Sequence, residues 1–266
     1  MNSATDISIW ELASGLLLFI IPIAFFYIYK IWIIKDVLIG LVRMLIQLSM
    51  VALYLEWIFE LNNAWLNSLW VMVMIIVGIL TTIRRVALNW RMFFVPLLLA
   101  SLTSVFIVDL FFLGWVLKLD YIFDARYFIP ITGMILGNAL NHNIVGLTTY
   151  FKGLGEKSEL YFFLLSNTGS KKLALRPFIN DAVKQGLNPM IATMSVIGLI
   201  SLPGMMTGQI LGGSSPVTAI KYQIMIMIAI FVGCTINLFL SILFSNRFIF
   251  DTYSNLKKGI FRKESK

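Results

Sequence analysis

Charged residues are scarce in this 266-residue chain. Asp, Glu, Lys and Arg make up 13% of it and hydrophobic residues 59%, whereas a soluble domain has about 25% charged and about 45–50% apolar residues. So few polar residues cannot cover a soluble core, so the composition predicts an all-α integral membrane protein. The apolar segments follow one another almost end to end. We therefore expect one membrane domain over residues 1–266, in the cell (inner) membrane as a multi-pass protein.

Cysteine and histidine occur once each, as Cys234 and His142. A single cysteine excludes an intrachain disulfide framework. A membrane-embedded enzyme would need paired carboxylates or a histidine cluster at one depth, and the sequence offers only scattered acids and one histidine. A phosphate-binding loop is absent too, because Glu156 separates Gly155 from Lys157 in the stretch Lys-Gly-Leu-Gly-Glu-Lys-Ser, whereas that loop needs glycine and lysine side by side. We expect no catalytic residue and no cofactor in this chain.

Long apolar runs predict about seven transmembrane helices. A helix needs about 20 mainly apolar residues to cross the hydrocarbon. The candidate segments are Ile7–Tyr29, Val37–Phe59, Trp65–Ile83, Met92–Leu117, Phe128–Tyr150, Pro189–Leu211 and Val217–Phe244.

Lys and Arg residues predict the orientation of these helices. They account for the net charge of +8, but most lie in alternate connections between apolar runs, so we expect no nucleic-acid binding. Because cytoplasmic loops carry the excess of Lys and Arg, the pattern places the N-terminus outside and the C-terminus in the cytoplasm. The groups assigned to the cytoplasm are Lys30 and Lys35; Arg84, Arg85 and Arg91; Lys152, Lys157, Lys171, Lys172, Arg176 and Lys184; and Arg247, Lys257, Lys258, Arg262, Lys263 and Lys266.

The largest non-membrane piece is a cytoplasmic loop near residues 151–188. Its residues at about 170–186 follow a helical pattern, and Gly186 and Pro189 are expected to end that helix. A short amphipathic helix between two spans suits the membrane surface or a cytoplasmic partner. The residues that we assign to docking are Leu173, Arg176, Phe178, Asp181, Ala182 and Val183.

The sixth predicted span is interrupted at Pro203. Proline removes a backbone donor and blocks a helix carbonyl, and broken helices in membranes mark transport pathways in several folds. Polar residues at membrane depth are functional candidates for the same reason. The pathway candidates are Arg43, Gln47, Asn138, His142, Leu202, Pro203, Gly204, Met205, Met206, Thr207, Gly208 and Gln209. Among them His142, Met205 and Met206 are the candidate metal ligands, since imidazole and thioether groups bind transition metals; packing is the alternative role for each.

Residues 202–213, Leu-Pro-Gly-Met-Met-Thr-Gly-Gln-Ile-Leu-Gly-Gly, followed by Ala-Ile-Lys-Tyr-Gln-Ile at 219–224, resemble the signature of the Fet-type (FetB-like) iron-export ABC permease family, to which plant aluminium-sensitivity proteins are related. Segments 42–48, 129–138 and 175–189 agree, so the resemblance covers most of residues 40–230.

The resemblance implies a permease that works as a homodimer and is driven by a separate cytosolic ABC ATPase subunit, which would hold ATP and Mg²⁺. It also implies iron or another metal ion as the exported substrate. The alternatives are an ABC permease for a different substrate, such as a nucleotide sugar or a lipid, and a membrane-embedded enzyme. The partners that we expect are the ATPase subunit, a second copy of the chain and membrane lipid.

Overall fold

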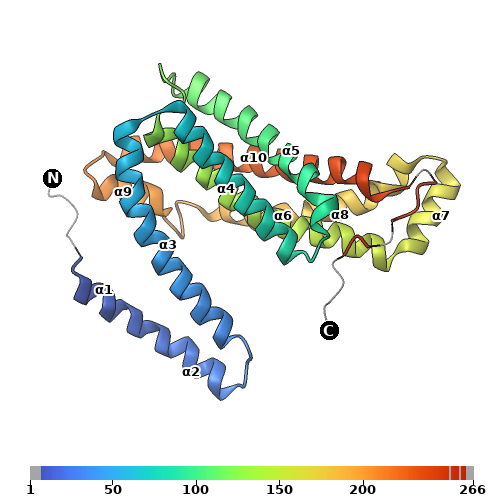
Figure 1. Cartoon of the computed structure of the whole chain (residues 1–266), viewed down its shortest axis with the longest axis horizontal. Helices are drawn as coiled ribbons and strands as arrows, with labels where there is room; N and C mark the ends of the chain where they lie inside the picture. The colour runs from blue at the N-terminus through green and yellow to red at the C-terminus, as the bar shows by residue number, and fades with distance from the viewer. Residues whose placement is uncertain (1–6, 252, 258, 262–266) are drawn as a thin grey trace.

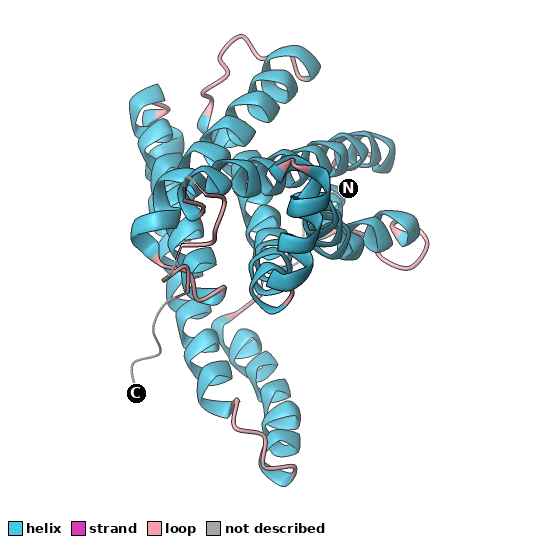
Figure 2. Cartoon of the chain, turned by 90° about the vertical axis from the view of Figure 1, so that its right-hand side faces the viewer, coloured by secondary structure: helices cyan, strands magenta, loops and turns pink. Residues whose placement is uncertain are grey.

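The computed structural model describes residues 7–251, 253–257 and 259–261, and across these residues every named element is a helix (Figures 1 and 2). The first span is built from three consecutive pieces, and a π-helix follows α5. The elements are α1 (Ile9–Leu16), η1 (Leu17–Phe19), α2 (Ile20–Ile28), α3 (Ile34–Leu61), α4 (Ala64–Arg85), α5 (Trp90–Asp109), the π-helix η2 (Leu110–Val116), α6 (Ala125–Glu156), α7 (Ser158–Thr168), α8 (Lys171–Val196), α9 (Gly204–Leu211) and α10 (Pro216–Ile249).

Short polar side chains set where several of these helices begin. Asn63 accepts hydrogen bonds from Trp65 N and Leu66 N at the start of α4. Asn89, Asp124 and Ser215 accept from backbone N–H groups in the same way at α5, α6 and α10. These caps satisfy backbone donors that a helix leaves unpaired in its first turn. The helix boundaries therefore follow from the sequence at polar residues that flank apolar runs.

Five helical segments are long and apolar enough to cross a membrane, counted over the described residues: Ile9–Ile28, Ile34–Leu61, Ala64–Arg85, Trp90–Val116 and Pro216–Ile249. Each contains most or all of a predicted span, so the membrane character and five of the seven predicted segments are confirmed. The predicted segment 128–150 lies within the 32-residue helix α6. The number of seven crossings stays a prediction.

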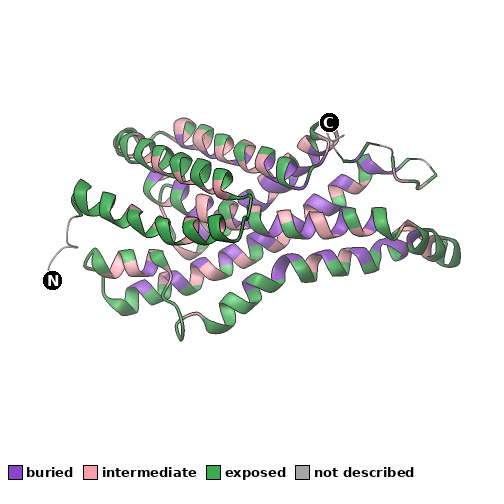
Figure 3. Cartoon of the chain, turned by 90° about the horizontal axis from the view of Figure 1, so that it is seen from below, coloured by how far each residue is buried: buried purple, intermediate pink, exposed green. Residues whose placement is uncertain are grey.

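The core of the molecule is a bundle in which α10 packs against α5 and α6, α4 packs against α5 and α6, and α8 lies along α6. Helices α1 and α2 and the N-terminal part of α3 stand away from this bundle (Figure 1). No residue of α1 or α2 is buried, and Ile58 is the only buried residue of α3 (Figure 3). The C-terminal end of α3 joins the bundle through Ile58, which clusters with Ala125 and Ile129 of α6.

Loops that the charge pattern assigns to one side of the membrane contact one another. Asn89 N donates to Ile260 O at 2.9 Å, which joins the α4–α5 connection to the C-terminal segment. At the opposite end, Ala125 N donates to Asn62 Oδ1 at 2.9 Å, which joins the α3–α4 connection to the start of α6. The basic α4–α5 connection and the C-terminal segment thus meet at one end of the bundle. Lys258, Arg262, Lys263 and Lys266 of the last basic group lie outside the described residues.

The expected end of the cytoplasmic helix at Gly186 and Pro189 is wrong, because α8 continues without interruption to Val196. The expected start of the sixth span at Pro189 falls within this continuous helix and stays a prediction. Pro189 costs the helix only the bond that its missing N–H would make to Gln185, an exposed residue. Gly186 is buried in the crossing of α8 and α6, where a Cβ would lie 3.3 Å from Gly146 Cα. The glycine is there for close packing, a common use of small residues between membrane helices.

Candidate functional site

The site forms where the chain breaks between α8 and α9, at residues 197–203. Gly198 adopts a φ of 83°, a conformation that favours glycine. Its N–H donates to Ser201 O at 3.0 Å, so the broken segment forms a tight turn. Pro203 then precedes the first turn of α9, and its carbonyl accepts from Thr207 N at 3.0 Å. The predicted interruption is confirmed, and it spans seven residues in place of a single kink.

This break opens a pocket of about 420 Å³ between α6, α8, α9 and α10. A volume of this size is within the range of small-molecule sites, about 300–1,000 Å³. Five of the predicted pathway residues meet here, although they come from segments about 60 residues apart. The lining residues are Met134, Asn138, Asn141, His142, Pro189, Met190, Thr193, Pro203, Gly204, Met205, Gln223, Ile226, Met227 and Ile230.

His142 is held in one orientation within this pocket. Its Nδ1 lies 2.7 Å from the carbonyl oxygen of Gly186, and only 7% of the residue is exposed. A carbonyl oxygen can only accept, so Nδ1 carries the proton and Nε2 of the neutral ring has a free lone pair. The close crossing of α6 and α8 at Gly186 therefore fixes the tautomer of the histidine.

A second pocket of about 390 Å³ lies on the other side of Met205, which lines both. Gln209 also lines this second pocket, and its Oε1 is buried without a hydrogen-bond partner among the described residues. The wall of this pocket also contains Arg126, Tyr127 and Tyr222. Met205 thus stands at the junction of two spaces, a position suited to a side chain that controls passage between them.

The other predicted pathway residues lie elsewhere. Arg43 and Gln47 are exposed on α3, at a part of this helix that stands away from the bundle (Figure 1). Neither pocket is lined by Leu202 of the break or by Thr207 and Gly208 of α9. Met206 of α9 is buried and lines neither pocket as well. Of the three candidate metal ligands, the structure brings His142 and Met205 together and directs Met206 away from the pocket.

The predicted docking residues divide between two faces of α8. Leu173, Arg176 and Asp181 are exposed, and Val183 is partly exposed. Phe178 and Ala182 are buried against the bundle, with Phe178 packing edge-on to Tyr161 of α7. The surface that a partner can reach is therefore more polar than the apolar stripe read from the sequence, with Leu173, Arg176, Pro177, Asn180, Asp181 and Lys184 on one side of the helix.

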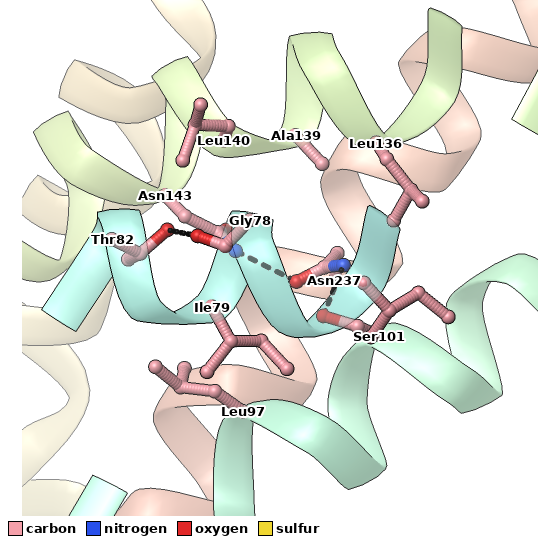
Figure 4. A pocket seen from close by; sticks show the side chains of 11 residues that line it. Gly78, Ile79, Thr82, Leu97, Ser101, Leu136, Ala139, Leu140, Asn143 and Asn237 are labelled. Atoms are coloured by element: carbon pink, nitrogen blue, oxygen red, sulfur yellow. Dashed lines mark hydrogen bonds between the residues drawn. The ribbon is translucent and has the colours of Figure 1, made fainter. Parts of the chain in front are cut away.

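A separate polar cluster joins three helices, α5, α6 and α10, through hydrogen bonds in the core (Figure 4). Asn143 Nδ2 of α6 donates to Asn237 Oδ1 of α10 at 2.7 Å, and Asn237 Nδ2 donates to Ser101 Oγ of α5 at 3.2 Å. Thr82 of α4 completes the lining of a cavity of about 20 Å³, which is the size of one water molecule. This cluster is therefore a packing feature and too small for a ligand.

Asp109 also makes a contact between helices, α5 and α6, and lines neither of the two larger pockets. It is 4% exposed, and Thr132 Oγ1 donates to its Oδ2 at 2.5 Å. It is the last residue of α5, directly before the π-helix. The structure pairs Asp109 with a neutral hydroxyl on α6.

The sequence did not single out two polar lining residues of the first pocket, Thr193 and Gln223. Gln223 is 9% exposed, and its Oε1 has no hydrogen-bond partner within the described part of the chain. The motif around residues 219–224 contains Gln223, but nothing in its spacing distinguishes it from its neighbours. Arg126, which lines the second pocket, was not among the predicted pathway residues either.

Comparison with known proteins gives one family match. The family model described as "Uncharacterised protein family (UPF0014)" matches residues 9–250. The UPF0014 membrane protein YjkA of Bacillus subtilis is 28% identical over 236 residues, which cover 87% of this chain and 91% of YjkA.

Two relatives carry more descriptive names. The "Probable iron export permease protein FetB" of Escherichia coli is 30% identical over 230 residues, covering 85% of each chain. The Arabidopsis thaliana "Protein ALUMINUM SENSITIVE 3" is 27% identical over 216 residues, covering 81% of this chain and 77% of the plant protein. No solved structure matches the chain.

Proposed function

This chain belongs to the UPF0014 family of membrane proteins, and we propose that it is the membrane-spanning permease subunit of an ABC transporter that exports iron or another metal ion. ATP hydrolysis takes place on a separate cytosolic subunit in this proposal. The metal is taken from the name of the E. coli relative FetB, which is similar over 85% of the chain. A permease is a transport protein, so no reaction is assigned to its own residues.

The observation that carries the proposal is the course of α8. Its N-terminal half presents Arg176 and Asp181 at the end of the bundle where the basic loops gather. Its C-terminal half supplies Pro189, Met190 and Thr193 to the wall of the first pocket. Because one continuous helix of 26 residues joins the two regions, a push on its exposed end moves the pocket wall directly.

In the proposal, movement of α8 opens the pocket alternately to the two sides of the membrane. Displacement of α8 by the ATPase shifts its C-terminal half relative to α6 and α10, and the turn at residues 197–203 absorbs the change. The route then runs from the first pocket past Met205 to the second. Rigid-body movement of one helical unit around a site built on broken helices is a common solution for membrane transport.

A homodimer is part of the same proposal. The two N-terminal spans have none of their apolar window buried by the rest of the chain, and Arg43 and Gln47 are exposed on one of them. A charged side chain facing hydrocarbon is costly. A second copy packed against α3 gives these two polar residues partners.

The proposal is tested by coexpressing the chain with an ABC ATPase encoded beside it and purifying the pair through a tag on one subunit. The charge reversals Arg176→Glu and Asp181→Lys are expected to lower copurification at least about tenfold, because they alter the exposed face of α8. Glu159→Lys is the matched control, since Glu159 is exposed on the neighbouring helix α7. Recovery of the permease without any ATPase in mild detergent would contradict the proposal.

ATP-dependent metal efflux in proteoliposomes that hold both subunits tests transport itself. A passive channel would move the ion equally well without ATP.

A further inference from the structure

The first pocket is unusually rich in thioether groups. Four of its fourteen lining residues are methionines, whereas the chain as a whole has 13 among 266 residues. Met134, Met190, Met205 and Met227 come from four different helices, α6, α8, α9 and α10. Methionine often fills gaps in apolar cores, but these four side chains surround an open space of about 420 Å³.

An imidazole nitrogen with a free lone pair belongs to the same wall. Because Nδ1 of His142 donates to Gly186 O at 2.7 Å, the unprotonated nitrogen is Nε2. Histidines that bind metal ions through one ring nitrogen donate the other N–H to a carbonyl or carboxylate in this manner. In this tautomer the lone pair of Nε2 is the one that can bind a cation.

Among the described residues, no charged side chain lines the pocket. Its remaining polar groups are amides and a hydroxyl, from Asn138, Asn141, Thr193 and Gln223. A small trivalent cation such as Fe³⁺ or Al³⁺ requires several carboxylates to offset the loss of its hydration, as hard cations prefer anionic oxygen ligands. Thioether and imidazole groups instead select soft or borderline transition metals of low charge.

We propose that this pocket binds a soft or borderline transition cation in its reduced form, Cu⁺ or Fe²⁺, through His142 Nε2 and the thioethers of Met190, Met205 and Met227. The inference rests on the proposed function in that the bound cation is the transported one. It adds the oxidation state and ligand chemistry of the cargo and assigns the residues that recognise it. Met205 is the ligand shared with the second pocket, so it is the group that passes the ion onward.

Metal binding to the purified full-length permease tests the site without the ATPase. Cu⁺ and Fe²⁺ are titrated under anaerobic conditions, and Fe³⁺ and Al³⁺ are titrated as their citrate complexes. We expect one Cu⁺ or Fe²⁺ per chain and at least about a hundredfold weaker binding of the two trivalent ions. Equal or tighter binding of Fe³⁺ or Al³⁺ would overturn the proposal.

Methionine-to-leucine variants test the ligands because leucine keeps the size and apolar character of the side chain. Met205→Leu and Met227→Leu are each expected to weaken Cu⁺ binding at least about tenfold and to lower the sulfur scattering in X-ray absorption spectra. Met225→Leu is the matched control, since Met225 lies on the same helix as Met227 but lines a different, apolar pocket. Wild-type affinity in both Met205→Leu and Met227→Leu would count against the thioether ligands.

The substitution His142→Asn separates metal binding from structural support. In His142→Asn the amide nitrogen takes the place of Nδ1 and keeps the donor to Gly186, but the nitrogen at the Nε2 position is lost. We expect this variant to melt close to the wild type and to bind Cu⁺ at least about tenfold more weakly. Full binding by His142→Asn would show that the residue only supports the helix crossing.

Failure of this inference is distinguishable from failure of the proposed function. ATP-driven efflux of metal that is unchanged in Met205→Leu and His142→Asn would remove the proposed ligands and leave the transporter assignment in place. Binding as expected, without ATP-driven transport by the permease and its ATPase, would leave the site in place and remove the transporter assignment.

Discussion

Asn237 lies where α5, α6 and α10 meet. It accepts from Asn143, donates to Ser101 and is 2% exposed. Hydrogen bonds between membrane helices contribute on average about 0.6 kcal/mol and at most about 1.7 kcal/mol each. Asn143 and its partner Asn237 lie 94 residues apart in the chain, so only the fold pairs them.

The variant Asn237→Leu is expected to lower the free energy of unfolding by about 1–2 kcal/mol, because it leaves the Asn143 amide and the Ser101 hydroxyl without this partner in a dry environment. Thermal unfolding in detergent measures the effect. Asn167→Ala is the control, because Asn167 is exposed and bonds only to Phe163 O of its own helix. Equal stability of the two variants would show that the cluster in Figure 4 contributes nothing to folding.

At the scale of an element, α8 combines two roles that the sequence separated into a docking helix and a membrane span. Gly186 and Pro189 suggested a boundary, since both residues weaken isolated helices. Packing overrides that preference, because Gly186 allows α8 to approach α6 at Gly146. The apolar stripe expected at Phe178 and Ala182 faces the bundle for the same reason.

The variant Gly186→Ala is expected to destabilise the protein by about 1–3 kcal/mol through overpacking. The added methyl group would lie 2.8 Å from Leu238 Cδ2 and 3.2 Å from the His142 carbonyl oxygen. Leu238 can rotate, but the backbone of α6 cannot yield without separating the two helices. Unfolding in detergent provides the measurement.

Gly155→Ala is the matched control for this crossing, because a Cβ there meets nothing within 4 Å. It is expected to leave stability unchanged or slightly raised. The double variant Gly186→Ala, Leu238→Ala is expected not to recover full stability, since the backbone contacts remain. Wild-type stability of Gly186→Ala alone would mean that the α6–α8 crossing is looser than the structure shows.

At the scale of the whole molecule, the two N-terminal spans bury none of their apolar windows within the single chain. Apolar residues of α1, α2 and the first part of α3 suit lipid, but Arg43 and Gln47 on α3 do not. An interface between two copies is self-complementary when they are related by a two-fold axis. The face of α3 that carries Gln47 then meets the same face of the second copy.

The variant Gln47→Cys is therefore expected to form a disulfide-linked dimer in membranes after mild oxidation. The native Cys234 is fully buried and does not interfere. Phe106→Cys is the control, because Phe106 is 67% exposed on α5 of the bundle. Non-reducing gel electrophoresis reports the result, and equal crosslinking at both positions would rule out a specific α3 interface.

The orientation in the membrane is also a property of the whole molecule. A membrane-impermeant thiol reagent added to intact cells is expected to label Trp65→Cys and to label Lys157→Cys only after permeabilisation, both in a Cys234→Ala background. Trp65 is 86% exposed at the end of α4 opposite the basic loops. Labelling of Lys157→Cys in intact cells would reverse the orientation predicted from the Lys and Arg distribution.

The sequence by itself determined that the chain lies in a bilayer, approximately which segments span it, where the helix break falls and to which family the chain belongs. These features follow from local composition, because a bilayer requires long apolar runs and proline interrupts a helix wherever it cannot be accommodated. Only the tertiary structure decided that His142, Met190, Met205 and Met227 share one pocket while Arg43 and Gln47 stay apart from it. Side-chain packing between segments far apart in the sequence decides which residues lie close together. Helical periodicity predicts the faces of a helix but not which helices pack against each other.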